Sequence, residues 1–242
     1  MKIKLFLTMA IFISIVPATE AQFRTGVKGG LVFSRFSEDI DPFAKNSKYS
    51  EDYIGFQKVF RSGATGGFFA EFMINNATRI GGELLFAARG SKYRYHNSKV
   101  YLLDEDGNKS KAYDTYTYQT DYLELPVYLQ LDTRAGFNTV GISVYGGVAP
   151  AVPVNRKRVY RYYDIEGFAA KGDQKKMKRE LENVRAFNLF PLVGIKLGSD
   201  RAFLDLRYST TFRPVFGNSP TGPDTDFNTR MSSLSATVGI YF

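Results

Sequence analysis

The sequence contains no cysteine and no tryptophan, and His96 is its only histidine. The lack of cysteine excludes disulfides, thiolate metal sites and cysteine nucleophiles. A single histidine argues against imidazole metal sites and against a Ser-His-acid triad. We therefore expect no catalytic residue, no metal site and no cofactor.

Long apolar runs are also missing after the N-terminal region. No run there approaches the roughly 18–20 residues of a transmembrane helix. The N-terminus carries two lysines, an apolar run over residues 5–16 that is too short to cross a bilayer, and small residues at Thr19 and Ala21. This order is typical of a secretory signal peptide. We predict a signal peptide over residues 1–21 and a single mature domain over residues 22–242, with an uncleaved anchor helix as the alternative.

Glycine, tyrosine and phenylalanine are abundant, with 22, 16 and 21 residues. This composition favours strands and turns over helices. The stretch DYLELPVYLQLD (121–132) shows the pattern most clearly, because leucine or valine alternates along it with tyrosine, proline and polar residues. Side chains of a strand alternate between its two faces, so this strand has one aliphatic face and one polar face.

Eight segments show strand patterns, and most are about as long as a membrane-crossing strand. They are residues 23–36, 63–74, 79–95, 113–131, 139–151, 185–197, 201–212 and 230–242. The connections alternate between short turns (75–78, 132–138, 198–200) and long segments (37–62, 96–112, 152–184, 213–229). This layout is typical of an outer-membrane barrel. We predict an all-β fold: a single eight-stranded antiparallel up-and-down transmembrane β-barrel with four long extracellular loops and three short periplasmic turns.

The aliphatic face of these strands could meet either lipid or an internal cavity, and two features favour lipid. The polar face is rich in glycine, which suits the crowded interior of an eight-stranded barrel. Its charges balance, four against four, as a filled lumen requires because buried charges must be paired. The predicted lumen charge network is Lys28, Glu71, Glu83, Arg89, Glu124, Lys196, Asp205 and Arg207. A soluble barrel with an aliphatic ligand cavity is the alternative.

Aromatic residues near the strand ends predict girdles at the two membrane interfaces. The residues assigned to these girdles are Tyr93, Tyr95, Tyr116, Tyr118, Phe212 and Tyr241. They would hold the barrel at the level of the lipid headgroups.

Two stretches resemble a known family. DYLELP (121–126) is similar to a strand motif of the PorT-like outer-membrane β-barrel family of Bacteroidetes-type bacteria, and GVKGGLVFS (26–34) resembles that family's first strand. The terminal aromatic residue, Phe242, is similar to the signal read by the barrel-assembly machinery. The resemblance implies a barrel in the outer membrane, and it raises the hypothesis of a role in protein secretion.

Basic residues concentrate in the segment 152–184, which has nine Lys or Arg against five Asp or Glu. The candidate polyanion-binding residues are Arg156, Lys157, Arg158, Arg161, Lys175, Lys176, Lys178 and Arg179. On a cell surface, such a segment would attract lipopolysaccharide or other surface polyanions rather than nucleic acid. A solvated charged loop without a ligand is the alternative.

These features predict a monomeric, non-enzymatic outer-membrane barrel with membrane lipid as a partner, acting as a structural or interaction scaffold through its loops. A component of a protein secretion system, with secretion-machinery or surface proteins as partners, is the second hypothesis. An enzyme acting on lipid or polymer is the third, because Glu71, Glu83 and Glu124 lie on neighbouring predicted strands. Pairing of these carboxylates with lumen cations explains them more simply.

Overall fold

The computed structural model describes residues 23–37, 53–103, 108–133, 141–170, 173–217 and 229–242. Its strands are β1 (Phe23–Phe36), β2 (Tyr53–Val59), β3 (Arg61–Asn75), β4 (Thr78–Leu103), β5 (Lys109–Glu124), β6 (Val127–Asp132), β7 (Gly141–Tyr162), β8 (Gly167–Ala169), β9 (Lys175–Glu180), β10 (Asn188–Gly198), β11 (Ala202–Thr210) and β12 (Met231–Tyr241). No helix formed by the described residues is long and apolar enough to cross a membrane. The predicted signal peptide, residues 1–21, lies outside the described residues.

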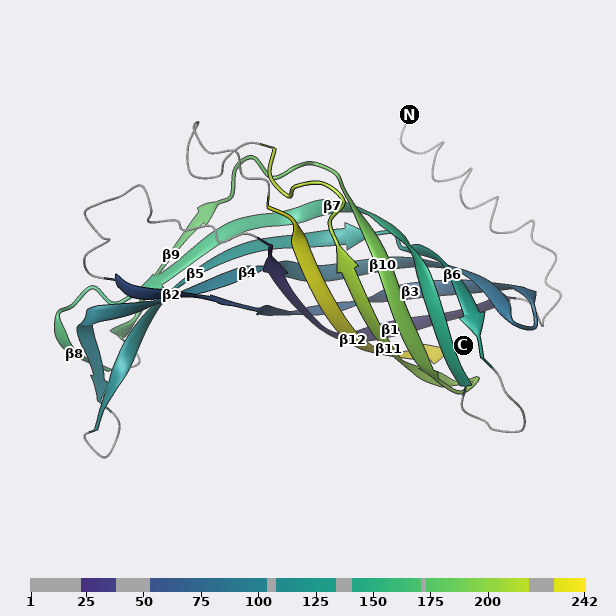
Figure 1. Ribbon diagram of the computed structural model, residues 1–242, viewed down its shortest axis with the longest axis horizontal. Coiled ribbons are helices and arrows are strands. Elements are labelled where there is room, and N and C mark those ends of the chain that lie inside the picture. Colours follow the sequence, from purple (N-terminus) through teal and green to yellow (C-terminus); the bar gives the residue numbers. More distant parts are fainter. Residues whose placement is uncertain (1–22, 38–52, 104–107, 134–140, 171–172, 218–228) are drawn as a thin grey trace.

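The strands close into a ring, because β1 pairs with both β12 and β3 while β10 pairs with both β11 and β7 (Figure 1). The order around the ring is β1, β3, β4, β5 with β6, β7, β10, β11 and β12. β5 and β6 share one position, since both pair with β4 on one side and β7 on the other. All these pairs are antiparallel, so the predicted all-β, eight-stranded antiparallel barrel is confirmed.

A break at Pro126 divides what the sequence pattern indicates as one strand over residues 113–131. The β4 partners of Glu124 and Val127 are three residues apart, as are these two residues themselves, so the register continues across the break. Proline has no N–H and cannot donate to the ladder. Its carbonyl still accepts a hydrogen bond from the Glu83 N–H at 2.9 Å, which keeps β6 aligned with β5.

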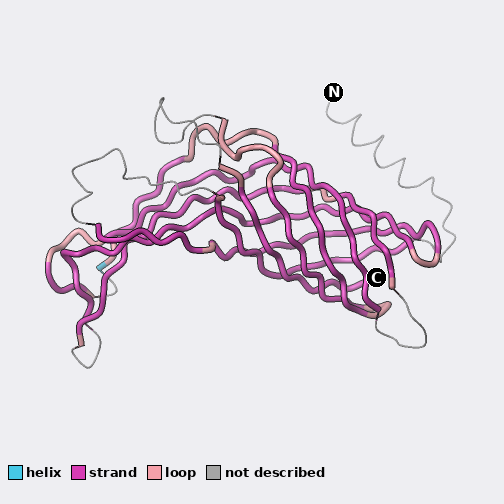
Figure 2. Tube along the Cα trace, in the orientation of Figure 1, coloured by secondary structure: helices cyan, strands magenta, loops and turns pink. Residues whose placement is uncertain are grey.

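Three strands of the ring continue beyond it as an extension of the same sheet. There β4, β5 and β7 pair with one another, and β2 and β9 add to the two edges in the order β2–β4–β5–β7–β9. β8 adds a short parallel pairing near the end of β4. Figure 2 shows this part as a long arm of strand leading away from the ring. We call it the extended sheet; it comprises residues 53–59, 92–103, 109–119, 155–162, 167–169 and 175–180.

Much of the length expected as long loops is therefore sheet. The segment 96–112 contains the ends of β4 and β5, and the segment 152–184 contains the end of β7 with β8 and β9. Tyrosine and threonine alternate in TYTYQT (115–120), and such residues favour strands when neighbouring strands offer partners. Of the segment 213–229, the described residues include an isolated bridge from Phe216 to Val184.

The outward face of the ring is aliphatic and exposed. Within 121–132, the alternate residues Leu123, Leu125, Val127, Leu129 and Leu131 are between 40% and 52% exposed. The residues between them, Tyr122, Glu124, Tyr128 and Gln130, are at most 2% exposed. The polar face is thus turned into the ring, and a soluble barrel with an aliphatic cavity is excluded.

The expected aromatic girdles are mostly wrong, because the tyrosines concerned lie inside. Tyr93, Tyr95 and Tyr118 are buried, since their positions have the inward parity of β4 and β5. Tyr116 packs against the same buried cluster, and the Tyr241 hydroxyl donates a hydrogen bond to the lumen residue Glu71. Of the six residues assigned to the girdles, Phe212 lies outside and is 61% exposed.

Inward-facing glycines make room for large aromatic rings on neighbouring strands. A Cβ atom at Gly194 would lie 2.3 Å from the Cζ atom of Tyr145, and one at Gly81 would lie 2.1 Å from the Cζ atom of Tyr128. Such distances are sterically forbidden, so each tyrosine can lie against its neighbouring strand only because a glycine stands there.

Leu84→Arg tests whether the outward band meets lipid. An arginine near the bilayer midplane on the lipid face of a barrel costs about 2–4 kcal/mol, and we expect the free energy of unfolding in lipid vesicles to fall by that amount. Leu103→Arg is the matched control on the same strand, because Leu84 and Leu103 are 45% and 46% exposed. We expect a change below about 0.5 kcal/mol at Leu103, which lies in the extended sheet. Equal losses at both positions would show that the band does not face lipid.

Candidate functional site: an ion-paired lumen and a basic outer sheet

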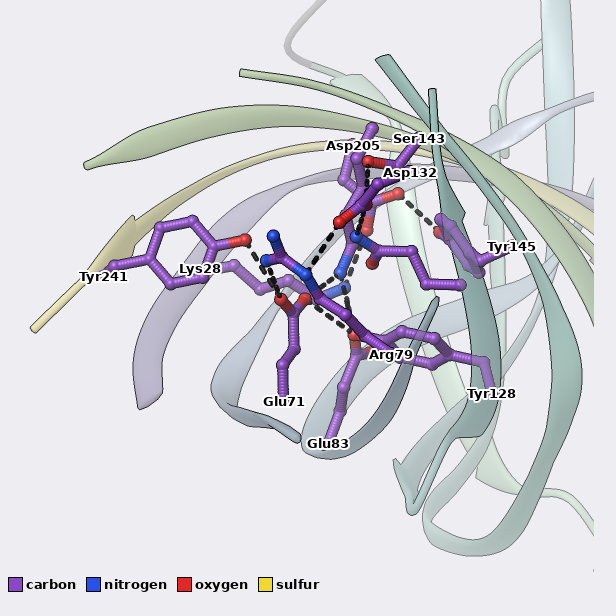
Figure 3. Close-up of polar contacts among 12 residues, drawn as sticks. Lys28, Glu71, Arg79, Glu83, Tyr128, Asp132, Ser143, Tyr145, Asp205 and Tyr241 are labelled. Atoms are coloured by element: carbon purple, nitrogen blue, oxygen red, sulfur yellow. Dashed lines mark hydrogen bonds and ion pairs between the residues drawn. The ribbon is translucent and has the colours of Figure 1, made fainter. Parts of the chain in front are cut away.

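Among the described residues, the lumen holds five cationic and five anionic side chains. Eight of them are the residues predicted from the sequence, each at most 5% exposed: Lys28, Glu71, Glu83, Arg89, Glu124, Lys196, Asp205 and Arg207. The other two are Arg79 and Asp132, whose side chains are 4% and 3% exposed. Figure 3 shows side chains of this set converging from several strands. The structure thus brings the predicted charges into one enclosed space.

The central cluster joins β1, β4 and β11. The Nζ atom of Lys28 lies 2.8 Å from Oε1 of Glu83 and 2.8 Å from Oδ2 of Asp205. Arg207 contacts the same two carboxylates, with Nη1 2.8 Å from Oε2 of Glu83 and Nη2 3.4 Å from Oδ2 of Asp205. The Tyr145 hydroxyl donates to Asp205 and accepts from Nε of Arg207 at 2.8 Å. Two cations and two carboxylates therefore neutralise one another in one hydrogen-bonded group.

A second cluster surrounds Glu71, which lies near the short turn between β3 and β4. Figure 3 shows Tyr241 directed toward the Glu71 carboxylate. The Glu71 carboxylate accepts hydrogen bonds from the Lys196 ammonium, from the Tyr128 hydroxyl at 3.3 Å and from the Tyr241 hydroxyl at 3.2 Å. The Lys196 ammonium also lies 4.6 Å from the centroid of the Tyr128 ring. A cation over an aromatic face gains a further attraction, so Lys196 is held by charge and by the ring together.

A third cluster lies nearer the extended sheet and contains the pair Arg89 and Glu124. Arg89 contacts the carboxylate with two nitrogens, Nε 2.8 Å from Oε1 and Nη2 2.8 Å from Oε2. Such a bidentate pair has a fixed geometry. The Nη1 atom of Arg89 donates to the hydroxyls of Ser209, at 2.9 Å, and Ser233. The guanidinium also lies 4.5 Å from the centroid of the Phe190 ring.

Sequence reasoning missed Arg79 and Asp132, which pair with each other in the lumen. The Nε atom of Arg79 lies 2.8 Å from Oδ2 of Asp132, and its Nη1 atom lies 3.4 Å from Oε2 of Glu71. The reason is that Arg79 starts a predicted strand and Asp132 starts a predicted turn. Both have the inward parity of their strands, shared with Glu83 and Glu124 respectively. Applying the alternation to the first residue of the strand 79–95, and extending the strand 113–131 by one residue, would have found them.

Apolar side chains fill the lumen between the charged clusters and the extended sheet. The largest fully buried members of this group are Phe36, Tyr93, Tyr118, Tyr122, Leu181, Phe190, Phe216 and Met231. At the opposite end, a hollow lined by Arg79, Asp132, Lys196 and other residues has about 30 Å³, which is room for about one water molecule. The described lumen is therefore packed with side chains rather than open.

The lumen carboxylates are poorly placed for acid–base chemistry. Glu71, Glu83 and Glu124 lie on neighbouring strands, but each is within ion-pair distance of a lysine or arginine. His96 packs beside Tyr113 in the extended sheet, away from them. Among the described residues, no group of three or more His, Asp or Glu could hold a metal ion.

The eight predicted polyanion-binding residues all lie on β7 and β9, which pair antiparallel in the extended sheet. Because side chains alternate along each strand, the register divides them between two faces. Lys157, Arg161, Lys176 and Lys178 share one face, and Arg156, Arg158, Lys175 and Arg179 share the other. The basic segment is therefore not one patch.

Two further basic residues, which sequence reasoning missed, join the first of these faces. Arg94 of β4 is opposite Thr115 of β5, and Thr115 is in turn opposite Arg161 of β7. Lys92 lies two residues before Arg94 and so has the same parity. Partial burial, together with the charges of Arg94 and Arg161, lowers the pKa of Lys92 below its usual value. The three cations are therefore close enough to influence one another.

Residues 18–217 match the family model described as outer membrane protein beta-barrel domain. The chain belongs to this family. As a member, it is an outer-membrane β-barrel protein, in agreement with the closed ring and its aliphatic band. The comparison with curated proteins finds no match.

Solved structures similar to this family member include bacterial outer-membrane proteins at low identity. Ail, the attachment invasion locus protein of Yersinia pestis, matches with a TM-score of 0.40 and 11% identity, covering 91% of this chain and 99% of that chain. OprG of Pseudomonas aeruginosa matches with a TM-score of 0.37 and 11% identity, covering 92% and 96%. Neisserial surface protein A matches with a TM-score of 0.37 and 14% identity, covering 90% and 97%.

A double-mutant cycle on Arg89 and Glu124 tests whether pairing holds the lumen together. Arg89→Met leaves a buried carboxylate without its cation, which typically costs about 3–5 kcal/mol. We expect the free energy of unfolding in lipid vesicles to fall by that amount. Arg89→Met combined with Glu124→Gln removes both charges, and we expect it to recover at least half of the loss. Strictly additive effects of the two substitutions would contradict the pairing.

Proposed function

We propose that the protein is a non-enzymatic, non-conducting scaffold whose filled barrel anchors the extended sheet at the cell surface. The observation that carries this proposal is the continuity of β4, β5 and β7, each of which is a single strand running from the ring into the extended sheet. Such strands hold a binding surface at a fixed height and orientation relative to the membrane. Barrels of this class turn their short connections to the periplasm, so the extended sheet would lie outside the cell.

Transport through the ring is the function that the lumen supports least. Three ion-paired clusters cross it, and the aromatic and aliphatic group closes it toward the extended sheet. Buried charges that neutralise one another in place cannot act as a track for ions without breaking several pairs. This supports the proposal that the protein acts through its surface.

The partners that fit this role are membrane lipid and surface polyanions such as lipopolysaccharide. The basis is the excess of basic residues in the extended sheet. A monomer suits the ring, since closure leaves no strand edge within the membrane for a second copy to pair with. Nucleic acid is a poor fit because the basic residues would lie outside the cell.

A role in protein secretion is the second candidate, and it rests on the resemblance of DYLELP (121–126) to the PorT-like motif. In this chain the motif residues have structural tasks. Asp121 pairs with Arg61 at 3.0 Å, Tyr122 is fully buried, Glu124 pairs with Arg89, and Pro126 interrupts the ladder. These structural roles account for the motif without a function in secretion. Isolation of a stable complex with secretion proteins from native membranes would favour this candidate.

The third candidate, an enzyme acting on lipid or polymer, would need a lumen carboxylate that reaches substrate. Glu71, Glu83 and Glu124 are buried and paired. A hydrolytic activity of the pure protein that disappears in Glu83→Gln, with the barrel still folded, would favour it over the scaffold.

Planar bilayer recordings test the non-conducting barrel. We expect purified protein, inserted at a density confirmed by its heat-modifiable migration on gels, to produce no stable conductance steps. The physical reason is the packed and charge-neutral lumen. A water-filled porin inserted under the same conditions serves as the control. Reproducible steps from the wild-type protein would contradict the proposed function.

Shortening the extended sheet tests its role as a scaffold. Asn97 and Ala112 are paired in the structure. Replacing residues 98–111 by Asn-Gly connects these two residues by a two-residue hairpin turn. We expect this variant to insert and to keep its heat-modifiable migration, because the ring is untouched. We also expect it to lose those cross-links to surface molecules on intact cells that the wild-type protein forms through the removed end of the sheet, and to keep those formed through the retained part. Loss of membrane insertion or of heat-modifiable migration would contradict the separation of a membrane anchor from a surface sheet.

A further inference from the structure

One face of the extended sheet carries a regular array of cations drawn from three strands. Its members are Lys92 and Arg94 of β4, Lys157 and Arg161 of β7, and Lys176 and Lys178 of β9. In one row across the sheet, Arg94 is followed by Thr115, Arg161 and Lys176 on successive strands. In the next row, Lys92 is followed by Thr117, Val159 and Lys178. We call these six residues the outward basic face.

The outward basic face has the same parity as the lipid-facing band of the ring. On β4, the exposed residues Leu84 and Phe86 differ from Lys92 and Arg94 by even numbers of positions. On β5, Leu123 faces lipid, and Thr117 and Thr115 lie an even number of positions from it. The same surface of the same strands therefore changes from aliphatic to basic as it leaves the ring.

The change begins close to the end of the exposed aliphatic band. On β7, the last exposed aliphatic residue is Val154, at 55% exposure. A bulge at Val154 shifts the alternation by one position, so Lys157, three residues later, lies on the outward side. Three residues of strand span about 10 Å. The polar layer of a bilayer leaflet is roughly 5–8 Å thick. With Val154 at the edge of the hydrocarbon and the strands tilted as in other barrels, Lys157 would lie at the level of the headgroups, and the other cations would lie farther out.

Within the described part of the chain, the cations of this face are not neutralised by acidic side chains. Glu180, opposite Lys157, is the one acidic residue in these rows of the described strands. Among the described residues, no carboxylate forms an ion pair with any of the six. The opposite face differs, because there Lys175 pairs with Asp164 at 2.6 Å. Five of the six cations are exposed, and Lys92 is half-buried beside Arg94 and Arg161.

Unneutralised cations held close together are costly unless an anion binds between them. Adjacent strands are about 4.8 Å apart, so Arg94 and Arg161, which flank Thr115, are separated by roughly 10 Å at the backbone. Their guanidinium groups can converge on one phosphate, and arginine binds phosphate through two parallel hydrogen bonds. Lysines in the neighbouring row add point charges for a second phosphate.

We propose that the outward basic face binds the phosphate groups of the anionic glycolipid, lipopolysaccharide, in the outer leaflet beside the barrel. This inference rests on the proposed function, since it requires the extended sheet to lie on the outer side of the membrane. It assigns the partner of one face, adds Lys92 and Arg94 to it, and excludes Arg156, Arg158, Lys175 and Arg179. The bound lipid would fix the sheet against the membrane surface.

The test uses two variants of the full chain with equal loss of charge. The outward variant carries Arg94→Gln, Arg161→Gln and Lys176→Gln, which form one row of the face. The control variant carries Arg156→Gln, Arg158→Gln and Arg179→Gln, which lie on the other face of β7 and β9. Binding of bisphosphorylated lipid A to each protein in neutral detergent micelles is measured by titration at fixed salt.

We expect the outward variant to bind at least tenfold more weakly than wild type, and the control variant to stay within about threefold. The expectation follows because each basic residue near an anionic lipid surface contributes roughly a fivefold factor. Dephosphorylated lipid A should bind wild type as weakly as it binds the outward variant. Equal losses in both variants, or binding that ignores the phosphates, would overturn the proposal.

Inorganic polyphosphate distinguishes the lipid from a soluble polyanion. If polyphosphate binds the outward basic face while lipid A does not, the proposed lipid source is wrong. Both variants should keep heat-modifiable migration and show no conductance. A folded, non-conducting outward variant with unchanged lipid affinity would overturn this inference and leave the proposed scaffold function standing. Conductance by the wild-type protein would overturn the proposed function and not the lipid-binding inference.

Discussion

Charge pairing inside a closed ring is the constraint on which the rest of this structure depends. A barrel in hydrocarbon must close to satisfy its backbone, and eight strands enclose a space only wide enough for side chains. Ten described charged groups share that space, and a buried charge without a partner is strongly destabilising. Lys28 reaches Asp205, 177 residues away in sequence, and Lys196 reaches Glu71 across the ring. These pairs fix the position of strands that are not neighbours in the sheet.

Packing around the charges follows from the same limited width. Tyr145 and Tyr128 supply hydroxyls to the acidic residues while their rings lie against Gly194 and Gly81. A larger residue at either glycine would displace the ring and with it the hydroxyl. Aromatic residues thus serve the polar network here instead of forming a girdle at the lipid interface. The interior is specified jointly by charge, hydroxyl donors and the absence of side chains at a few positions.

The proposed function belongs to the outer surface, because side chains fill the described lumen. β4 and β5 carry their alternation past the ring, and β7 does so after a bulge at Val154 that shifts its alternation by one position. The two faces of these strands meet new surroundings there. The inward-facing positions continue as a tyrosine-rich surface, of which Tyr93, Tyr95 and Tyr118 are buried. Outward parity changes from leucine, valine and phenylalanine to lysine and arginine. One strand pattern therefore produces both a lipid-facing band and a basic surface next to it.

The sequence by itself determined the signals that are local. Alternation along 121–132 showed which side chains share a face, the eight patterned segments gave the strand count, and the eight charges assigned to the lumen lie there. Tertiary structure alone decided which charges pair, because pairing depends on ring closure and on register between distant strands. It also decided that much of 96–112 and 152–184 is sheet, since a strand forms there only where neighbouring strands supply partners. For the same reason the basic segment divides into two faces, and Lys92 and Arg94, far away in sequence, complete one of them.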